Sequence, residues 1–219
     1  DAGASINKIV AGGRGGWCFE VNGAFAALLE ALGFRVNLLG AAVLLDGPSR
    51  VIEHVALEVE LDQPYLVDVG FGESSIRPLA LNRRGRQDGG SADYQFIASP
   101  EGTTLALLDE SDADAVPVAQ YRFKRVAHSL TDFAAVAASM QFNPDKNWHK
   151  RPFATRLLDC GPDRVTLTYD RLKVVQDGNT TEQPITINEW STALLDWFGI
   201  RLGAAAEAAL RSQIRPAQP

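Results

Sequence analysis

Three residues of types that support nucleophilic catalysis occur in order in the first third of the chain: Cys18, His54 and Asp68. A cysteine thiol must become a thiolate to attack a carbonyl carbon, and an imidazole within hydrogen-bonding reach can take its proton. A carboxylate can fix the imidazole tautomer and support its positive charge. Taken singly, each residue also has an ordinary structural explanation, since a free cysteine is often a small core residue. Together they predict a nucleophilic site, provided that the fold brings them into contact.

The cysteine lies in residues 13–23, whose sequence is GRGGWCFEVNG. Apolar residues then recur with the spacing of an amphipathic helix, namely Val21, Phe25, Leu28, Leu29 and Leu32. Gly33 is suited to cap the end of this helix. Cys18 therefore falls at or near the helix N-terminus, where unpaired N–H groups and the helix dipole stabilise a thiolate. The same N–H groups can stabilise an oxyanion.

The histidine and the aspartate fall in segments with a β-type pattern. Residues 36–45, 51–61 and 65–69 are separated by turn sequences, which predicts antiparallel strands. Folding the chain about residues 62–63 places Asp68 opposite residue 57 or 58, a few positions from His54. We expect sheet twist or a bulge to close this gap.

The remainder of the chain predicts further sheet and two helical segments. The arginine- and glycine-rich residues 82–92 indicate an exposed loop. Residues 131–138 have the pattern of a capped helix, and a second helix is expected from about Ile187. Further strands are predicted at residues 103–108, 118–126, 165–169 and 172–176.

Composition narrows the functional classes. The chain has 219 residues, of which 46% are hydrophobic, so it is long enough to bury a substantial core. A net charge of -6 argues against nucleic acid as a partner. No apolar run approaches the roughly 18 residues that span a bilayer, and no signal peptide pattern is present. We therefore expect a cytoplasmic protein without membrane association.

The cysteines and histidines do not predict a metal site. Two cysteines make neither a disulfide framework nor a four-ligand zinc set, although the sequence leaves a single bridge between Cys18 and Cys160 open. Cys160 is interpreted as structural. His128 and His149 lack the spacing of metal ligands, so no bound metal is expected.

Four short motifs resemble, in order, the signatures of the arylamine N-acetyltransferase family. Thirty-six positions separate the cysteine from the histidine and 14 separate the histidine from the aspartate, close to the family pattern. Weaker similarity extends to residues 164–167, so the resemblance covers essentially the whole chain. The motifs are Lys8-Ile9-Val10, residues 14–22 (RGGWCFEVN), residues 54–59 (HVALEV) and residues 68–72 (DVGFG).

This resemblance implies an α+β fold in three parts. Residues 1–33 would be the remnant of an N-terminal helical bundle that carries the cysteine. Residues 34–130 would form an antiparallel β-barrel with the histidine and the aspartate, and residues 131–219 an α/β lid. It also implies a catalytic triad of Cys18, His54 and Asp68 that transfers an acetyl group in a ping-pong reaction.

The implied substrates are acetyl-CoA and an aromatic amine, a hydrazine or an N-hydroxyarylamine. Trp17, Phe19 and Phe71 are candidates for aromatic walls around a planar substrate. Gly70 and Gly72 lack side chains and are candidates for backbone contacts to CoA.

The chain also departs from the family pattern. Family members usually carry about fifty further residues at the start, and that segment supplies a carboxylate partner for the residue corresponding to Arg14. A separate N-terminal segment or a homo-oligomer could supply what is missing. Alternatives that use the same residues are an amide synthase, a cysteine hydrolase, and an inactive homologue that acts as a binding protein.

Overall fold

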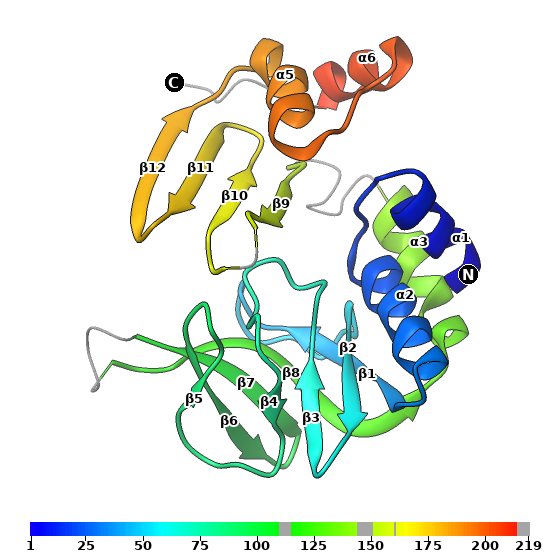
Figure 1. Ribbon diagram of the computed structural model, residues 1–219, viewed down its shortest axis with the longest axis vertical. Coiled ribbons are helices and arrows are strands. Elements are labelled where there is room, and N and C mark those ends of the chain that lie inside the picture. Colours follow the sequence, from blue (N-terminus) through cyan, green and yellow to red (C-terminus); the bar gives the residue numbers. More distant parts are fainter. Residues whose placement is uncertain (110–114, 144–150, 160, 214–219) are drawn as a thin grey trace. The chain divides into compact units, whose positions relative to one another are not determined.

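The computed structural model describes residues 1–109, 115–143, 151–159 and 161–213. The chain forms two compact units, Asp1–Ala137 and Ala138–Pro219 (Figure 1). The predicted Cys18, His54 and Asp68 all belong to the first unit. The division into residues 1–33, 34–130 and 131–219 stays a prediction. The helix that carries the cysteine and the barrel strands lie together in the first of the two units. None of the described helices is both long enough and apolar enough to cross a membrane.

The first unit begins with short helices that precede the cysteine helix. The N-cap of α2 is Trp17, whose N–H donates to Glu20 Oε2 at 3.3 Å. The C-cap of α2 is Leu32, and Gly33 follows with a φ of 91°, a left-handed conformation suited to glycine. The predicted helix, with the cysteine at its start, is therefore confirmed. The bounds are α1 (Ala2–Ile6), the π-helical turn η1 (Asn7–Ala11) and α2 (Cys18–Ala31).

An eight-stranded antiparallel sheet forms the rest of this unit. Its strand order is β4-β3-β2-β1-β8-β7-β6-β5, so β1 pairs both with its neighbour in sequence and with the distant β8. The sheet curls into a nearly closed barrel (Figure 1). The bounds are β1 (Arg35–Val43), β2 (His54–Glu60), β3 (Pro64–Val67), β4 (Leu79–Ala80), β5 (Gln87–Asp88), β6 (Asp93–Ser99), β7 (Gly102–Leu108) and β8 (Val118–His128).

Alternation along the strands separates two cores. On one face of β2, Leu57 and Val59 pack against Ala26 and Phe25 of α2. The opposite face points into the barrel, which is filled by large and small apolar side chains. These are Leu39, Ala41, Ala56, Leu66, Leu79, Tyr94, Leu105, Tyr121 and Phe123.

A buried glutamine joins the two edge strands of the barrel. Gln87 Oε1 accepts a hydrogen bond from the N–H of Ala80 at 2.9 Å, and its Nε2 donates to the carbonyl of Ala80 at 3.1 Å. The side-chain amide thus takes the place of a neighbouring backbone amide. The prediction of an exposed loop at residues 82–92 is wrong at this point, because residues 87–88 form β5. The composition of these residues is typical of a loop, but a short strand forms because the Gln87 side chain bonds the backbone of the neighbouring edge strand.

The first unit leads into a capped helical segment. Ser129 precedes the 3-10 turn η2 (Leu130–Phe133), and its N–H donates to Asp132 Oδ2 at 2.9 Å. The helix α3 (Ala134–Phe142) follows directly. The predicted helix at residues 131–138 is therefore confirmed and extends further.

The second unit is a four-stranded antiparallel sheet with two helices. Trp190 of α5 is buried and donates from Nε1 to the carbonyl of Thr168 at 2.8 Å, which ties the helix to the sheet. The predicted strands and the helix from Ile187 are confirmed. The bounds are β9 (Ala154–Leu157), β10 (Arg164–Leu167), β11 (Arg171–Gln176), β12 (Asn179–Pro184), α5 (Ile187–Phe198) and α6 (Ala204–Gln213).

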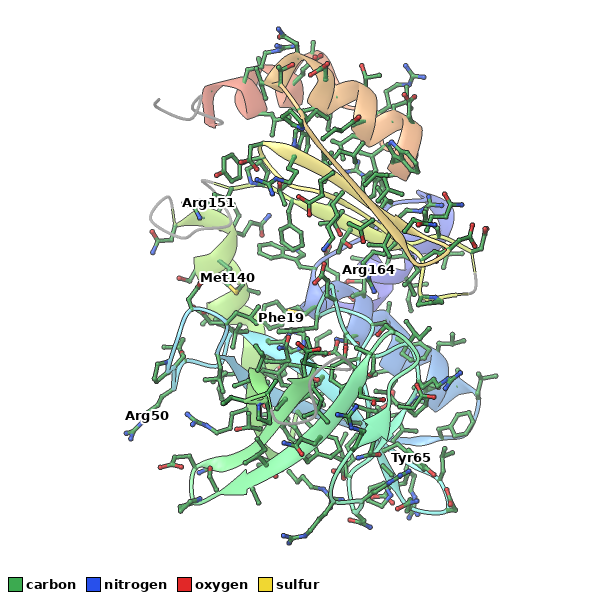
Figure 2. All side chains as sticks on the ribbon, turned by 90° about the vertical axis from the view of Figure 1, so that its left-hand side faces the viewer. Phe19, Arg50, Tyr65, Met140, Arg151 and Arg164 are labelled. Carbon is green, nitrogen blue, oxygen red and sulfur yellow. The ribbon has the colours of Figure 1, made fainter. Side chains whose placement is uncertain are left out.

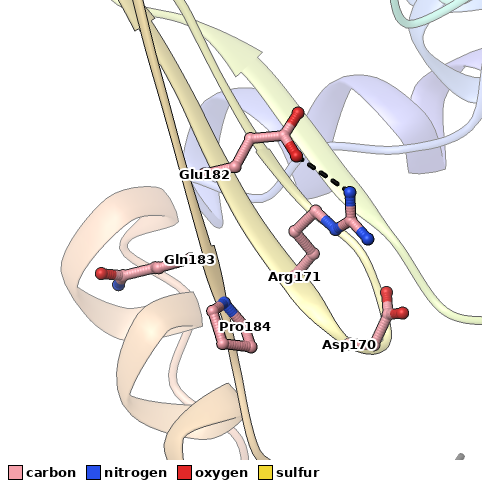
Figure 3. Close-up of a pocket in the computed structure, with 5 residues that line it drawn as sticks. All are labelled: Asp170, Arg171, Glu182, Gln183 and Pro184. Atoms are coloured by element: carbon pink, nitrogen blue, oxygen red, sulfur yellow. Dashed lines mark hydrogen bonds and ion pairs between the residues drawn. The ribbon is translucent and has the colours of Figure 1, made fainter.

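A pocket on the second unit lies along the edge strand β12. Arg171 Nη1 and Glu182 Oε2 are 2.9 Å apart across β11 and β12 (Figure 3). Both side chains are largely exposed, so solvent screens this ion pair. The pocket also includes Asp170, Gln183 and Pro184. It contains none of the residues that the sequence predicted for the site.

Replacing Gln87 with leucine tests its role in closing the barrel. Q87L removes the two hydrogen bonds to Ala80 and a longer one to the carbonyl of Arg83, and leaves the N–H and carbonyl of Ala80 without these partners. We expect the free energy of unfolding to fall by about 2 kcal/mol, measured by urea denaturation. Gln95→Leu is the matched control, because Gln95 lies half-buried on β6 and has no side-chain hydrogen bond among the described residues. Equal losses in the two variants would contradict this role.

Candidate active site

His54 and Asp68 form a buried pair at the end of the barrel. His54 Nε2 lies 2.6 Å from Asp68 Oδ2, and the two residues are only 3% and 5% exposed. The predicted position of Asp68, opposite residue 57 or 58, is wrong by at least one position. Leu57 pairs with Val67, so Asp68 follows opposite Ala56. The register of β2 and β3 is continuous, and the diagonal offset between the two residues is short enough to be spanned without a bulge.

Asn22 joins this pair to the cysteine helix. Its Nδ2 donates to the carbonyl of Val55 at 2.7 Å and to Asp68 Oδ1 at 2.9 Å, and its Oδ1 accepts from the N–H of Val69 at 3.0 Å. The residue is fully buried. It follows Cys18 by four positions and therefore lies one turn along the same helix face. Asn22 was not among the predicted site residues, and the only signal for it in the sequence is that spacing.

Gly70 allows the segment after β3 to approach the helix closely. Its N–H donates to Asp68 Oδ1 at 2.9 Å. A Cβ at this position would lie 2.7 Å from the Cα of Cys18 and 2.8 Å from Asn22 Nδ2. A larger residue would therefore push the helix away from the aspartate. The predicted contacts of Gly70 and Gly72 with CoA stay predictions.

Cys18 is the first residue of α2 and is 6% exposed. Its Sγ lies 3.9 Å from the carbonyl oxygen of Glu53, the residue before His54. Cys18 is also among the groups that raise the pKa of His54. Since Asp68 occupies Nε2, the imidazole nitrogen left for Cys18 is Nδ1. The structure thus brings the three predicted residues together in a chain of contacts.

Electrostatics favour an ionised His54–Asp68 pair. Burial alone would lower the pKa of His54, but the charge and hydrogen bond of Asp68, with a smaller contribution from Cys18, raise this pKa to about 10. Burial alone would raise the pKa of Asp68. The charge of His54 and hydrogen bonds from His54, Asn22 and Gly70 nevertheless hold the pKa of Asp68 below its ordinary value. The imidazolium form is therefore favoured at neutral pH.

Two aromatic rings enclose the imidazole. The ring of Phe71 is 5.1 Å from that of His54 and 4.8 Å from that of Tyr121, and Tyr121 is 5.0 Å from His54. The buried Tyr121 hydroxyl has no well-formed hydrogen bond among the described residues. Burial, and then the nearby charge of Asp68, hold the pKa of Tyr121 well above its ordinary value. Tyr121 lies on the distant β8 and was not among the predicted site residues.

The other predicted site residues differ in their surroundings. Phe71 contacts His54 and is half-buried, as is Trp17. Phe19 is 7% exposed and packs its ring 5.7 Å from that of Phe133, a core position (Figure 2). Arg14 is exposed, and its guanidinium has no ion-pair partner in the part of the chain that the structure describes. The predicted substrate contacts of the three aromatic residues and the predicted structural role of Arg14 stay predictions.

Within the described ranges, no group of three or more histidine, cysteine, aspartate or glutamate side chains could hold a metal ion. Cys160 and His149 lie outside those ranges. The predictions made for them are therefore not addressed by the structure.

Comparison with known proteins establishes the family. Residues 1–207 match the sequence model of a family described as N-acetyltransferase. A curated relative is the arylamine N-acetyltransferase of Escherichia coli (strain K12), which is 30% identical over 184 residues. The chain belongs to the arylamine N-acetyltransferase family. The alignment with the E. coli arylamine N-acetyltransferase covers 80% of this chain and 62% of the relative, so the chain spans less than two thirds of that protein.

Solved arylamine N-acetyltransferases share the fold. The Mycobacterium marinum enzyme in complex with CoA superposes with a TM-score of 0.86 at 25% identity, covering 98% of this chain and 82% of that one. A Bacillus cereus arylamine N-acetyltransferase described with a Cys-His-Glu triad gives a TM-score of 0.78 at 22% identity, covering 92% and 80%. The predicted α+β fold is confirmed.

Replacing Asn22 with leucine tests whether it holds the helix to the strands. N22L keeps a similar volume but leaves the carbonyl of Val55, the N–H of Val69 and one oxygen of Asp68 without this partner. We expect the free energy of unfolding to fall by about 3 kcal/mol, measured by urea denaturation. A loss below about 1 kcal/mol, typical of a surface substitution, would show that these bonds are dispensable.

The His54–Asp68 pair predicts a pH dependence of stability. The folded pKa of His54, about 10, lies above its ordinary value of 6.5. The stabilisation is therefore complete below about pH 6.5 and is lost as the pH rises towards 10. We expect the difference in unfolding free energy between wild type and Asp68→Asn to shrink over this range by up to about 1.4 kcal/mol per pH unit. A constant difference across the range would contradict an ionised pair.

Proposed function

We propose that this chain transfers an acetyl group from acetyl-CoA to an aromatic amine, a hydrazine or an N-hydroxyarylamine through an acetyl-cysteine. The observation that carries the proposal is the chain of contacts from the helix-start Cys18 through His54 to the buried Asp68. Family membership supports this chemistry, as does the relative solved in complex with CoA.

In the first half-reaction, His54 holds the proton that Cys18 has lost. The thiolate attacks the carbonyl carbon of the thioester, forming the bond from Sγ to carbon. The bond from carbon to the CoA sulfur then breaks, and the leaving thiolate takes the proton from Nδ1 of His54. Backbone N–H groups at the start of α2 are suited to stabilise the oxyanion formed between these events.

In the second half-reaction, the amine nitrogen attacks the acetyl-cysteine. His54, now neutral, accepts the proton released by the nitrogen, and the Cys18 thiolate leaves. Asp68 holds the imidazole ring in one orientation through both steps and stabilises its positive charge. An aromatic amine is weakly basic and mostly neutral at pH 7, so it can attack without a strong base.

The surroundings of the three residues support an aromatic acceptor. Phe71 lies against the imidazole, and Trp17 directly precedes the nucleophile, so both are proposed as walls for a planar ring. Gly72 has a φ of 93° and no side chain, and we assign it to the backbone surface that CoA approaches. The cytoplasm is the proposed location, since it keeps thiols reduced.

Acylation by acetyl-CoA tests this proposal directly. Intact mass and peptide mapping after incubation should find one acetyl group, on Cys18. Cys18→Ser should abolish the adduct, and Asp68→Asn should slow its formation by at least about 100-fold, since the imidazole loses its orienting carboxylate. A panel of arylamines and hydrazines should then discharge the adduct faster than water does.

Two outcomes would contradict the proposal. If wild type forms no adduct and alkylates at Cys18 no faster than an ordinary thiol, the nucleophile is absent. If water discharges the adduct as fast as any amine, the chain is a hydrolase. Far-ultraviolet circular dichroism of each variant provides the control for folding.

A further inference from the structure

Two groups that carry negative charge share the first turn of α2. Cys18 is the first helical residue and acts as a thiolate in the proposed reaction. Glu20, two positions later, accepts a hydrogen bond from the N–H of Trp17 through Oε2 at 3.3 Å. A carboxylate at this position stabilises the helix start. The same charge opposes a thiolate on Cys18, because like charges disfavour one another's ionised forms.

Lys8 of η1 contacts both oxygens of this carboxylate. Its Nζ lies 2.8 Å from Oε1 and 2.7 Å from Oε2 of Glu20. The two side chains are 38% and 25% exposed, so the pair is partly shielded from solvent. Lys8 lies 12 positions before Glu20, and the glycine-rich segment between them lets the chain turn back onto the helix.

The backbone before the cysteine confines the carboxylate to this place. A Cβ on Gly16 would lie 2.7 Å from Glu20 Oε2 and 2.8 Å from its Cβ. The Glu20 side chain therefore lies directly over Gly16, two residues before the nucleophile. The N–H of Arg14 donates to the carbonyl of Lys8 at 3.1 Å, which fixes the lysine backbone beside the same segment.

We propose that Lys8 is a positioning residue for the reaction: it neutralises Glu20, so that the carboxylate caps α2 without opposing the Cys18 thiolate. The inference rests on the nucleophilic role of Cys18 in the proposed function. The Lys8–Glu20 ion pair would then affect reactivity as well as stability, since an uncompensated carboxylate would cancel part of the positive potential at the helix start.

Other charged groups around the cysteine helix belong to different elements. The strands contribute the ionised His54–Asp68 pair and the protonated Tyr121. The segment at η2 contributes His128 and Asp132, which lie 3.6 Å apart beside Phe133. Arg14 is exposed, and Asp1 caps α1, which packs against α2. Glu20 lies on the first turn of α2 and Lys8 is its partner from η1, so their effect is separable by substitution.

The test measures the rate of alkylation of Cys18 by iodoacetamide as a function of pH. Peptide mapping assigns the modification to Cys18 and excludes Cys160. The rate follows the thiolate fraction. In Lys8→Met, the rise of the alkylation rate with pH should move to higher pH by about half a pH unit. This is the size expected for one uncompensated charge near the surface. Lys8→Arg should keep the wild-type profile.

A double substitution separates charge from structure. Glu20→Gln alone should not move the rise of the alkylation rate to higher pH. Lys8→Met combined with Glu20→Gln should return the rise to within about 0.2 pH units of wild type. Lys124→Met is the matched control, because it removes an equal charge from an exposed position on β8. It should leave the profile unchanged.

The outcomes distinguish this inference from the proposed function. If Lys8→Met lowers the melting temperature but leaves the pH dependence of Cys18 alkylation unchanged, the ion pair is only structural and the inference is overturned. It is also overturned if the double variant stays shifted. If wild-type Cys18 itself titrates like an ordinary thiol near pH 8.5, the proposed function fails instead.

Discussion

The buried contact between His54 and Asp68 is the interaction on which the rest of the first unit depends. Two charges removed from water carry a large desolvation penalty, and removing one partner leaves the other uncompensated. Here the carboxylate also accepts hydrogen bonds from Asn22 and from the N–H of Gly70. These bonds arise only if α2, β2 and the segment after β3 meet at one point. A polar cluster that contains the reacting groups therefore also specifies how the helix packs on the barrel.

The same cluster explains why small and polar residues follow the cysteine and the aspartate. Asn22 is a poor residue for an apolar helix face, but it satisfies backbone groups of β2 and of the segment after β3 at once. Gly70 leaves room for the Cα of Cys18. The spacing between nucleophile and imidazole is thus determined by a chain of short contacts and not by the loop between β1 and β2. Such pre-organisation lowers the cost of bringing the groups into alignment during a reaction.

Periodicity was enough to predict the cysteine helix and most strands, because the burial of one face imposes a pattern on the sequence. Features that depend on side chains from distant segments could not be predicted in this way. Asp68 was misplaced by one position because composition does not show which residues form a turn. The β5 strand was missed because Gln87 replaces a backbone partner with its side chain. Tyr121 lies 53 positions after Asp68, and local pattern carries no information about that contact.

The pairing of β1 with β8 has a consequence for how the protein reaches this structure. Leu38 pairs with His128, whereas His54 and Asp68 lie on a hairpin that closes within a few residues. Local pairings form early and long-range pairings form late, because a long loop must be closed first. During synthesis on the ribosome, the hairpin can therefore form while β1 still has an open edge. That edge remains available for mispairing until residue 128 has been made, and an open strand edge makes the chain prone to aggregation during this interval.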